Sequence, residues 1–140
     1  MKGRTTLTRS GTYNEEAFRR LLVNEVKRSE RSGHCYRILL VYNTNAQGVI
    51  VRMDSNVAKT VTVALSRCLR DTDYIGWYRE GRVVGAVLTV LERDSVADVF
   101  NRLRPRLEEI LRTELCLWES SGLLIRLCQY PELEGTEFGA

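Results

Sequence analysis

The sequence is poor in histidine, proline and long apolar runs. It has a single histidine, His34, and two prolines among 140 residues. No apolar run approaches the roughly 20 residues that cross a bilayer, and the start of the sequence lacks the apolar core of a signal peptide. These absences predict no membrane partner, and we expect a cytoplasmic location.

Clustered metal ligands are also lacking. The four cysteines are far apart in the sequence, none forms a C-x-x-C pair, and they lie in apolar surroundings at Cys35, Cys68, Cys116 and Cys128. A zinc site needs cysteines or histidines at short spacings. We therefore expect no metal site, no cofactor, and reduced thiols buried as small apolar side chains.

Lysine is scarce, whereas arginine is abundant. The chain has three lysines and eighteen arginines, yet its net charge is only +3. A general nucleic-acid-binding protein is usually more basic, with aromatic side chains between its charges. The composition therefore predicts no nucleic-acid partner. The guanidinium groups are suited to phosphates, carboxylates and guanine edges.

The apolar spacing predicts helices alternating with strands. Thr12 and Glu15 have the spacing of a capping box, and apolar residues then recur at helical intervals through residues 14–31. The same spacing predicts helices after Asp54 or Ser55 and after Ser95, the last with a possible kink at Pro105. Short apolar or β-branched runs predict strands at 36–42, 74–78, 83–91 and 122–130, a small extension at 49–51, and a further short one at 115–118.

This order predicts an α+β fold. We expect a βαββαβ core of the ferredoxin-like or nucleotide-cyclase type, in which a mixed sheet has its helices mainly on one side and an extra N-terminal helix is added. Residues 1–140 are expected to form a single domain, with flexible ends at 1–12 and 132–140. Such a core hosts many unrelated functions, so it does not identify one.

Three blocks of sequence, in the same order over about 120 residues, resemble the GGDEF family of diguanylate cyclases. The first runs from Leu7 through Tyr13 and Asn14 into the apolar stretch at residues 38–41. The second covers residues 69–78, and the third covers residues 124–131. The resemblance implies a nucleotide-cyclase fold and a role in cyclic di-GMP signalling.

The signature of that family is replaced at its central hairpin. Where members carry Gly-Gly-Asp/Glu-Glu-Phe, this chain has Arg79, Glu80, Gly81, Arg82 and Val83. The resemblance places the acidic pair at Gly81 and Arg82, and it places a further metal-binding aspartate in the stretch from Tyr42 to Thr44. Phosphoryl transfer depends on Mg²⁺ to neutralise phosphate charge. We therefore expect no catalytic residues and no enzyme activity.

One ligand motif of the family is retained ahead of the hairpin. Arg70 and Asp73 match the R-x-x-D motif that binds cyclic di-GMP in many members. An arginine can donate to guanine O6 and N7, and a carboxylate can accept from N1 and N2. The alternative is structural, because an arginine at a helix end and an aspartate at a turn also stabilise the backbone.

The sequence thus predicts a catalytically inactive GGDEF-like signalling domain. It is either a cyclic di-GMP receptor that uses Arg70 and Asp73, or a structural, protein-interaction or dimerisation domain that binds no nucleotide. The expected partners are cyclic di-GMP, another protein or a second copy of the chain. The identity of a protein partner and the oligomeric state stay open.

Overall fold

The computed structural model describes residues 12–33, 35–69, 73–90, 96–116 and 122–128. Its elements follow the predicted order, and the small extension predicted at 49–51 forms the short strand β2. They are α1 (Glu15–Ser32), β1 (Cys35–Thr44), β2 (Ile50–Val51), α2 (Ser55–Cys68), β3 (Tyr74–Arg79), β4 (Val83–Val90), α3 (Val96–Glu114) and β5 (Leu123–Cys128). The predicted ends, 1–12 and 132–140, lie outside the described residues except for Thr12, which is buried and therefore not part of a loose end.

Strand β1 is the centre of the sheet. It pairs antiparallel with β4 from Cys35 to Tyr42, with β5 from Ile38 to Asn43, and with the short β2 at its end. Strand β3 completes the sheet by pairing with β4. The side chains from Ile38 to Tyr42 are all buried, as expected for a strand covered on both faces.

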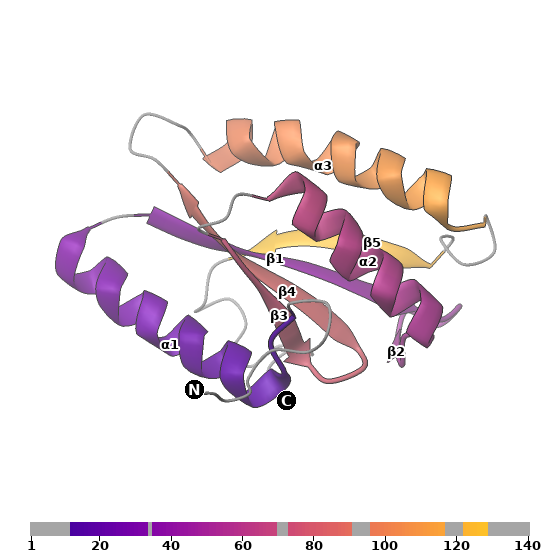
Figure 1. The fold of residues 1–140 in the computed structure, drawn as a ribbon, viewed down its shortest axis with the longest axis horizontal. Helices are drawn as coiled ribbons and strands as arrows, with labels where there is room; N and C mark the ends of the chain where they lie inside the picture. The colour runs from indigo at the N-terminus through magenta and orange to yellow at the C-terminus, as the bar shows by residue number, and fades with distance from the viewer. Residues whose placement is uncertain (1–11, 34, 70–72, 91–95, 117–121, 129–140) are drawn as a thin grey trace.

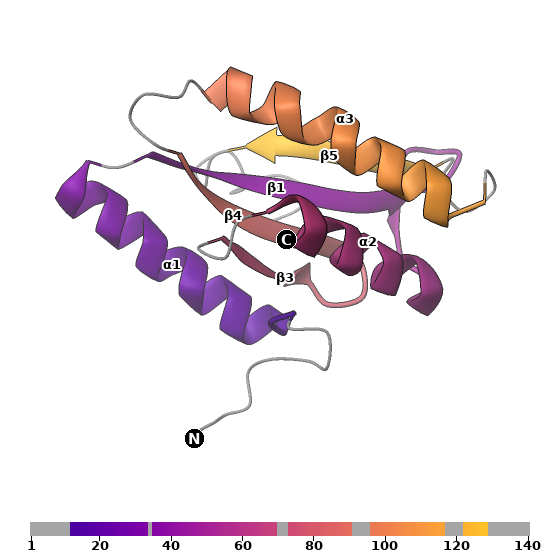
Figure 2. The same cartoon turned by 45° about the horizontal axis from the view of Figure 1, so that its top comes forward.

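The two faces of the sheet carry different helices (Figures 1 and 2). Helices α2 and α3 cover one face, where Leu65 and Leu107 pack with Leu39 and Val84. Helix α1 covers the other face. The α+β class, with two helices on one side and an added N-terminal helix, is confirmed. The sheet is mixed through one parallel bridge, between Tyr13 and Gly76, whereas its strand pairs are antiparallel.

Helix α1 presses an aromatic ring into a gap in the sheet. Gly76 and Gly85 are partners across β3 and β4, and the fully buried Phe18 lies over both. A Cβ atom at Gly76 would lie 2.5 Å from Phe18 Cδ1, and one at Gly85 would lie 2.9 Å from Phe18 Cε2. The glycines therefore provide the space into which α1 docks, because real side chains do not pack that closely.

The ends of the helices differ in part from the prediction. The N-cap of α1 is Asn14, whose side chain accepts from the backbone N–H of Ala17 at 2.9 Å, so the Thr12–Glu15 capping box was wrong. The N-cap of α2 is Asp54, one of the two candidates. Both Asn14 and Asp54 are residue types that accept readily from the first free amides of a helix.

Helix α3 is not divided at Pro105. It runs continuously from Val96 to Glu114. A short strand was predicted at 115–118, and this prediction is wrong at Leu115 and Cys116, which do not form a strand. Its apolar side, with Leu103, Leu107 and Leu111, is buried against the sheet and α2. No helix in the described part of the chain is long and apolar enough to cross a bilayer.

Candidate functional site

The hairpin between β3 and β4 is where sequence reasoning placed the family signature. The turn closes through the Arg82 N–H, which donates to Arg79 O at 3.0 Å. Gly81 has φ +76°, the left-handed conformation that glycine adopts without steric cost. The Met53 N–H donates to Gly81 O at 2.7 Å, so the segment that leads into α2 is fixed against the tip.

Arginine surrounds the position that the resemblance assigns to the first acidic residue. A Cβ atom at Gly81 would lie 3.2 Å from Cζ of Arg52, so the guanidinium covers this glycine. Arg82 follows directly, and neither Arg52 nor Arg82 forms an ion pair with another residue of the described part. A positively charged tip of this kind repels a divalent cation.

Glu80, the one carboxylate of the tip, is engaged with helix α1. Its Oε1 accepts from the Glu15 N–H at 3.1 Å, and Oε1 of Glu15 accepts from the Glu80 N–H at 2.6 Å. The first bond satisfies a free amide at the start of α1, where a negative charge is also favoured by the helix dipole. We call this reciprocal pair the Glu15–Glu80 clasp.

Arg19 strengthens the same junction. Its Nε donates to Tyr78 O at 2.9 Å, and its guanidinium carbon lies 4.5 Å from the centre of the Tyr78 ring. The same Nε atom of Arg19 lies 3.5 Å from Oε2 of Glu15. The carboxylates at the hairpin are thus held by backbone amides and by an arginine of α1.

The end of β1, where a further metal-binding aspartate was expected in active relatives, carries no acid. Tyr42 is buried in the core on the α1 face. The Thr44 N–H donates to Gly122 O at 2.9 Å, and the Thr44 hydroxyl reaches the same oxygen at 3.3 Å. In the described part of the chain, no three His, Cys, Asp or Glu side chains are grouped so that they could hold a metal ion.

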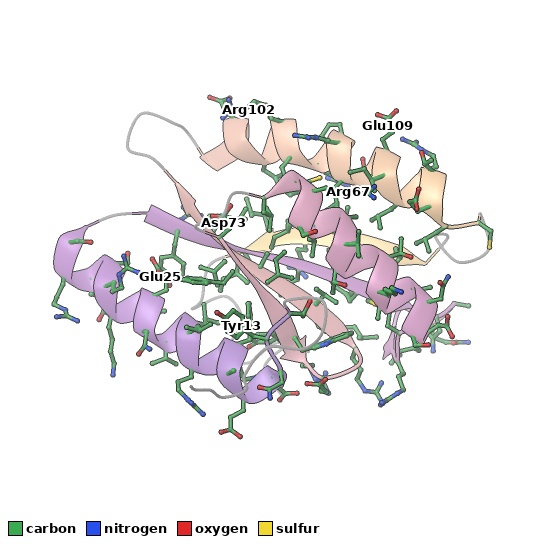
Figure 3. The ribbon with its side chains drawn as sticks, in the orientation of Figure 1. Tyr13, Glu25, Arg67, Asp73, Arg102 and Glu109 are labelled. Carbon is green, nitrogen blue, oxygen red and sulfur yellow. The ribbon has the colours of Figure 1, made fainter. Side chains whose placement is uncertain are left out.

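Only part of the R-x-x-D segment can be located. Arg70 and the two residues after it lie outside the described residues, whereas Asp73 is half-buried directly before β3 (Figure 3). Arg79 follows Asp73 by six residues along an extended strand, which places it roughly 20 Å away. The structure therefore does not bring Arg79 close to Asp73.

The end of α2, which leads into this segment, lies close to an arginine of α3. Burial raises the pKa of the Cys68 thiol, and the positive charge of Arg106 opposes that rise. Arg67 is exposed in the last turn of α2, whereas Arg102 points away from the sheet (Figure 3). Arg67 and Arg106 therefore place two cations at the end of α2.

Sequence reasoning missed two participants at the hairpin. Arg52 lies 29 residues before Gly81, and Glu15 lies 65 residues before Glu80. Asn14 followed by two glutamates is a recognisable helix start, but no local pattern indicates that a distant hairpin supplies the capping carboxylate.

Removal of the Glu80 carboxylate tests the clasp. Glu80→Ala leaves the first amide of α1 without its acceptor, and we expect a loss of about 0.5–1 kcal/mol in the free energy of unfolding, measured by urea denaturation. The control is Glu16→Ala, which removes an exposed i,i+4 pair with Arg20 and should cost less than about 0.5 kcal/mol. Equal losses for the two variants would contradict a specific role for Glu80.

Comparison with known proteins finds likeness at the level of structure. No protein-family model matches the sequence, and no curated protein matches it. A sensory box/GGDEF family protein from Caulobacter crescentus is similar with a TM-score of 0.66 and 14% identity, over 95% of this chain and 88% of that chain. A structure from Pseudomonas aeruginosa comprising only a GGDEF domain gives a TM-score of 0.63 and 18% identity, over 88% and 74% of the two chains.

A third similar structure contains a nucleotide. The GGDEF domain of DgcB from Caulobacter crescentus, in complex with c-di-GMP, gives a TM-score of 0.55 and 15% identity, over 91% of this chain and 77% of that chain. At these identities the likeness concerns the fold. The predicted nucleotide-cyclase architecture is confirmed by all three.

Proposed function

We propose that this chain, which has the fold of a GGDEF domain, is a signalling module that binds cyclic di-GMP and does not synthesise it. The observation that supports the absence of synthesis is the arrangement of the hairpin tip. The resemblance places the acidic pair at Gly81 and Arg82, Arg52 covers Gly81, and the Glu80 carboxylate is bonded to the start of α1. Mg²⁺-dependent phosphoryl transfer needs carboxylates that are available to the metal.

The proposed binding site is the R-x-x-D segment between α2 and β3. Asp73 stands at the start of β3, Arg67 is exposed on the last turn of α2, and Arg106 approaches from α3. A guanine base needs a bidentate donor and a carboxylate acceptor, which Arg70 and Asp73 would supply. The two phosphates need nearby cations, which Arg67 and Arg106 would supply. The DgcB complex with c-di-GMP has the same fold and supports this ligand class.

Calorimetric titration with cyclic di-GMP and with GTP, each with and without Mg²⁺, tests the proposal. We expect heat with cyclic di-GMP in both conditions, because the proposed contacts require no metal. An absence of heat with cyclic di-GMP would overturn the receptor function and would favour an interaction domain that binds no nucleotide.

The purified protein is also expected to form no cyclic di-GMP from GTP and Mg²⁺. The measurement is chromatography of the reaction mixture after prolonged incubation, with a heat-denatured sample as the control. Product that appears only with the native protein would show that another set of ligands holds the metal and would contradict the proposed loss of catalysis.

A further inference from the structure

The two outer strands of the sheet differ in how their free edges are covered. On β3, the Tyr13 N–H donates to Ile75 O at 3.0 Å, and the Trp77 N–H donates to Tyr13 O at 2.9 Å. On β5, the only strand pairing within the described residues is with β1. Proteins usually protect such edges, because a bare edge can pair with another chain.

A pocket lies beside β5. It has a volume of about 280 Å³ and is formed between β5 and the second half of α3, which passes over β5 in Figure 2. Its apolar lining includes Leu111, Leu123 and Ile125. Leu124 also borders it and is 47% exposed, one of three large apolar side chains so exposed in the described part. A pocket next to a free edge can accept a side chain of an added strand.

The charged residues around the pocket favour an anionic partner. Glu108 is paired with Arg104, with Oε2 and Nε 3.3 Å apart. Arg112, which also lines the pocket, forms no ion pair with a described residue. The charge of Arg112 is therefore available to a carboxylate of a partner.

We propose that β5 is a docking strand for an extended, acidic segment of a partner protein. The segment adds, through backbone hydrogen bonds, to the edge of β5 that has no strand partner among the described residues, inserts an apolar side chain into the pocket and places a carboxylate near Arg112. A second copy of this chain fits less well, because two β5 strands side by side would bring Arg112 of both copies to one surface, where Glu108 is already paired with Arg104. The surface lies at the opposite edge of the sheet from the R-x-x-D segment, so it does not depend on nucleotide binding.

Short strand-forming peptides test this proposal on the whole chain. The probe is a fluorescent peptide of alternating valine and glutamate, six residues long to match β5. We expect saturable binding by anisotropy and slower hydrogen exchange of the amides at residues 123–128. A peptide in which lysine replaces glutamate, and one interrupted by proline, are expected not to bind, because the first has the wrong charge and the second cannot continue the hydrogen-bond ladder.

Variants of the protein assign the binding to the surface. Arg112→Glu is expected to weaken binding roughly tenfold, and Leu124→Asn is expected to weaken it severalfold by removing apolar contact. Lys27→Glu makes the same charge change on the exposed side of α1 and should leave binding unchanged. The proposal would be overturned if the glutamate peptide failed to bind at about 1 mM or if the lysine peptide bound equally well. It would also be overturned if the slower hydrogen exchange were confined to strands other than β5, or if size-exclusion chromatography showed a dimer that forms through β5.

Discussion

Phe18→Ala is expected to lower the free energy of unfolding by about 3–5 kcal/mol. The ring is fully buried and lies on the Gly76–Gly85 pair, where neither glycine has a side chain of its own to fill the space. The loss therefore includes both the transfer of apolar surface and the cavity that remains. The loss is measured by urea denaturation, monitored by circular dichroism. The dependence of the unfolding free energy on urea concentration should be the same for the variant and the natural protein, as two-state unfolding requires.

Val23→Ala is the matched control on the same helix. Its side chain is 39% exposed, so the substitution should change stability by less than about 0.5 kcal/mol. A large loss for Val23→Ala would mean that the effect at Phe18 reflects helix propensity rather than the contact with the sheet.

Gly76→Ala separates the close contact from the burial. In the natural sequence its Cβ would lie 2.5 Å from Phe18 Cδ1, which is expected to cost about 1–3 kcal/mol through overpacking. In the Phe18→Ala background the clash is gone, and the same substitution should cost much less. Additive effects of the two substitutions would contradict direct contact, because residues that touch show coupling of about 0.5–3 kcal/mol.

Arg70→Ala is expected to weaken cyclic di-GMP binding by about 1–3 kcal/mol, or roughly 5- to 150-fold, by removing the bidentate contact to guanine. The measurement is calorimetric titration, and the melting temperature should be almost unchanged. Arg20→Ala is the control, because Arg20 is exposed and paired with Glu16 on α1, far from the segment in the fold. It should alter neither binding nor melting.

A structural role for the same motif predicts a different pattern. Arg70→Ala and Asp73→Ala would then lower the melting temperature, and titration of the natural protein would give no heat. Asp73→Ala alone can cost about 1 kcal/mol if the carboxylate caps local amides. Asp73→Asn is the more informative variant, because an amide keeps one acceptor oxygen for the backbone but cannot accept from both guanine N1 and N2.

Local patterns were sufficient for most of the fold. The apolar run in β1 predicted a central strand because such a strand is covered on both faces, and the 3–4 spacing in α2 was a better guide than its several β-branched residues. A short hairpin often requires a positive φ at a glycine, and Gly81 has one. Trp77 and Tyr78 are adjacent on a strand, where side chains alternate between the faces, and they pack in the two different cores.

The contacts that define the candidate site could not be predicted in the same way. The position of Arg52 over Gly81 and the Glu15–Glu80 clasp depend on how α1 and the segment before α2 dock on the hairpin. That docking follows from the fit of Phe18 over two glycines that are far from it in sequence. The R-x-x-D motif was recognisable because its two residues are close together, but its surroundings depend on the packing of α2 against α3.

The central place of β1 has a consequence for synthesis of the protein. β1 ends at Thr44, but β5, which pairs with one of its edges, ends at Cys128. The ribosome must add 84 further residues (128 − 44) before that edge can be covered, which takes roughly 4–17 s at usual elongation rates. During this interval the central strand, whose residues 38–42 are all buried in the folded protein, has an unpaired edge. Arrest or slow translation late in the message would therefore expose β1 to aggregation or chaperone binding.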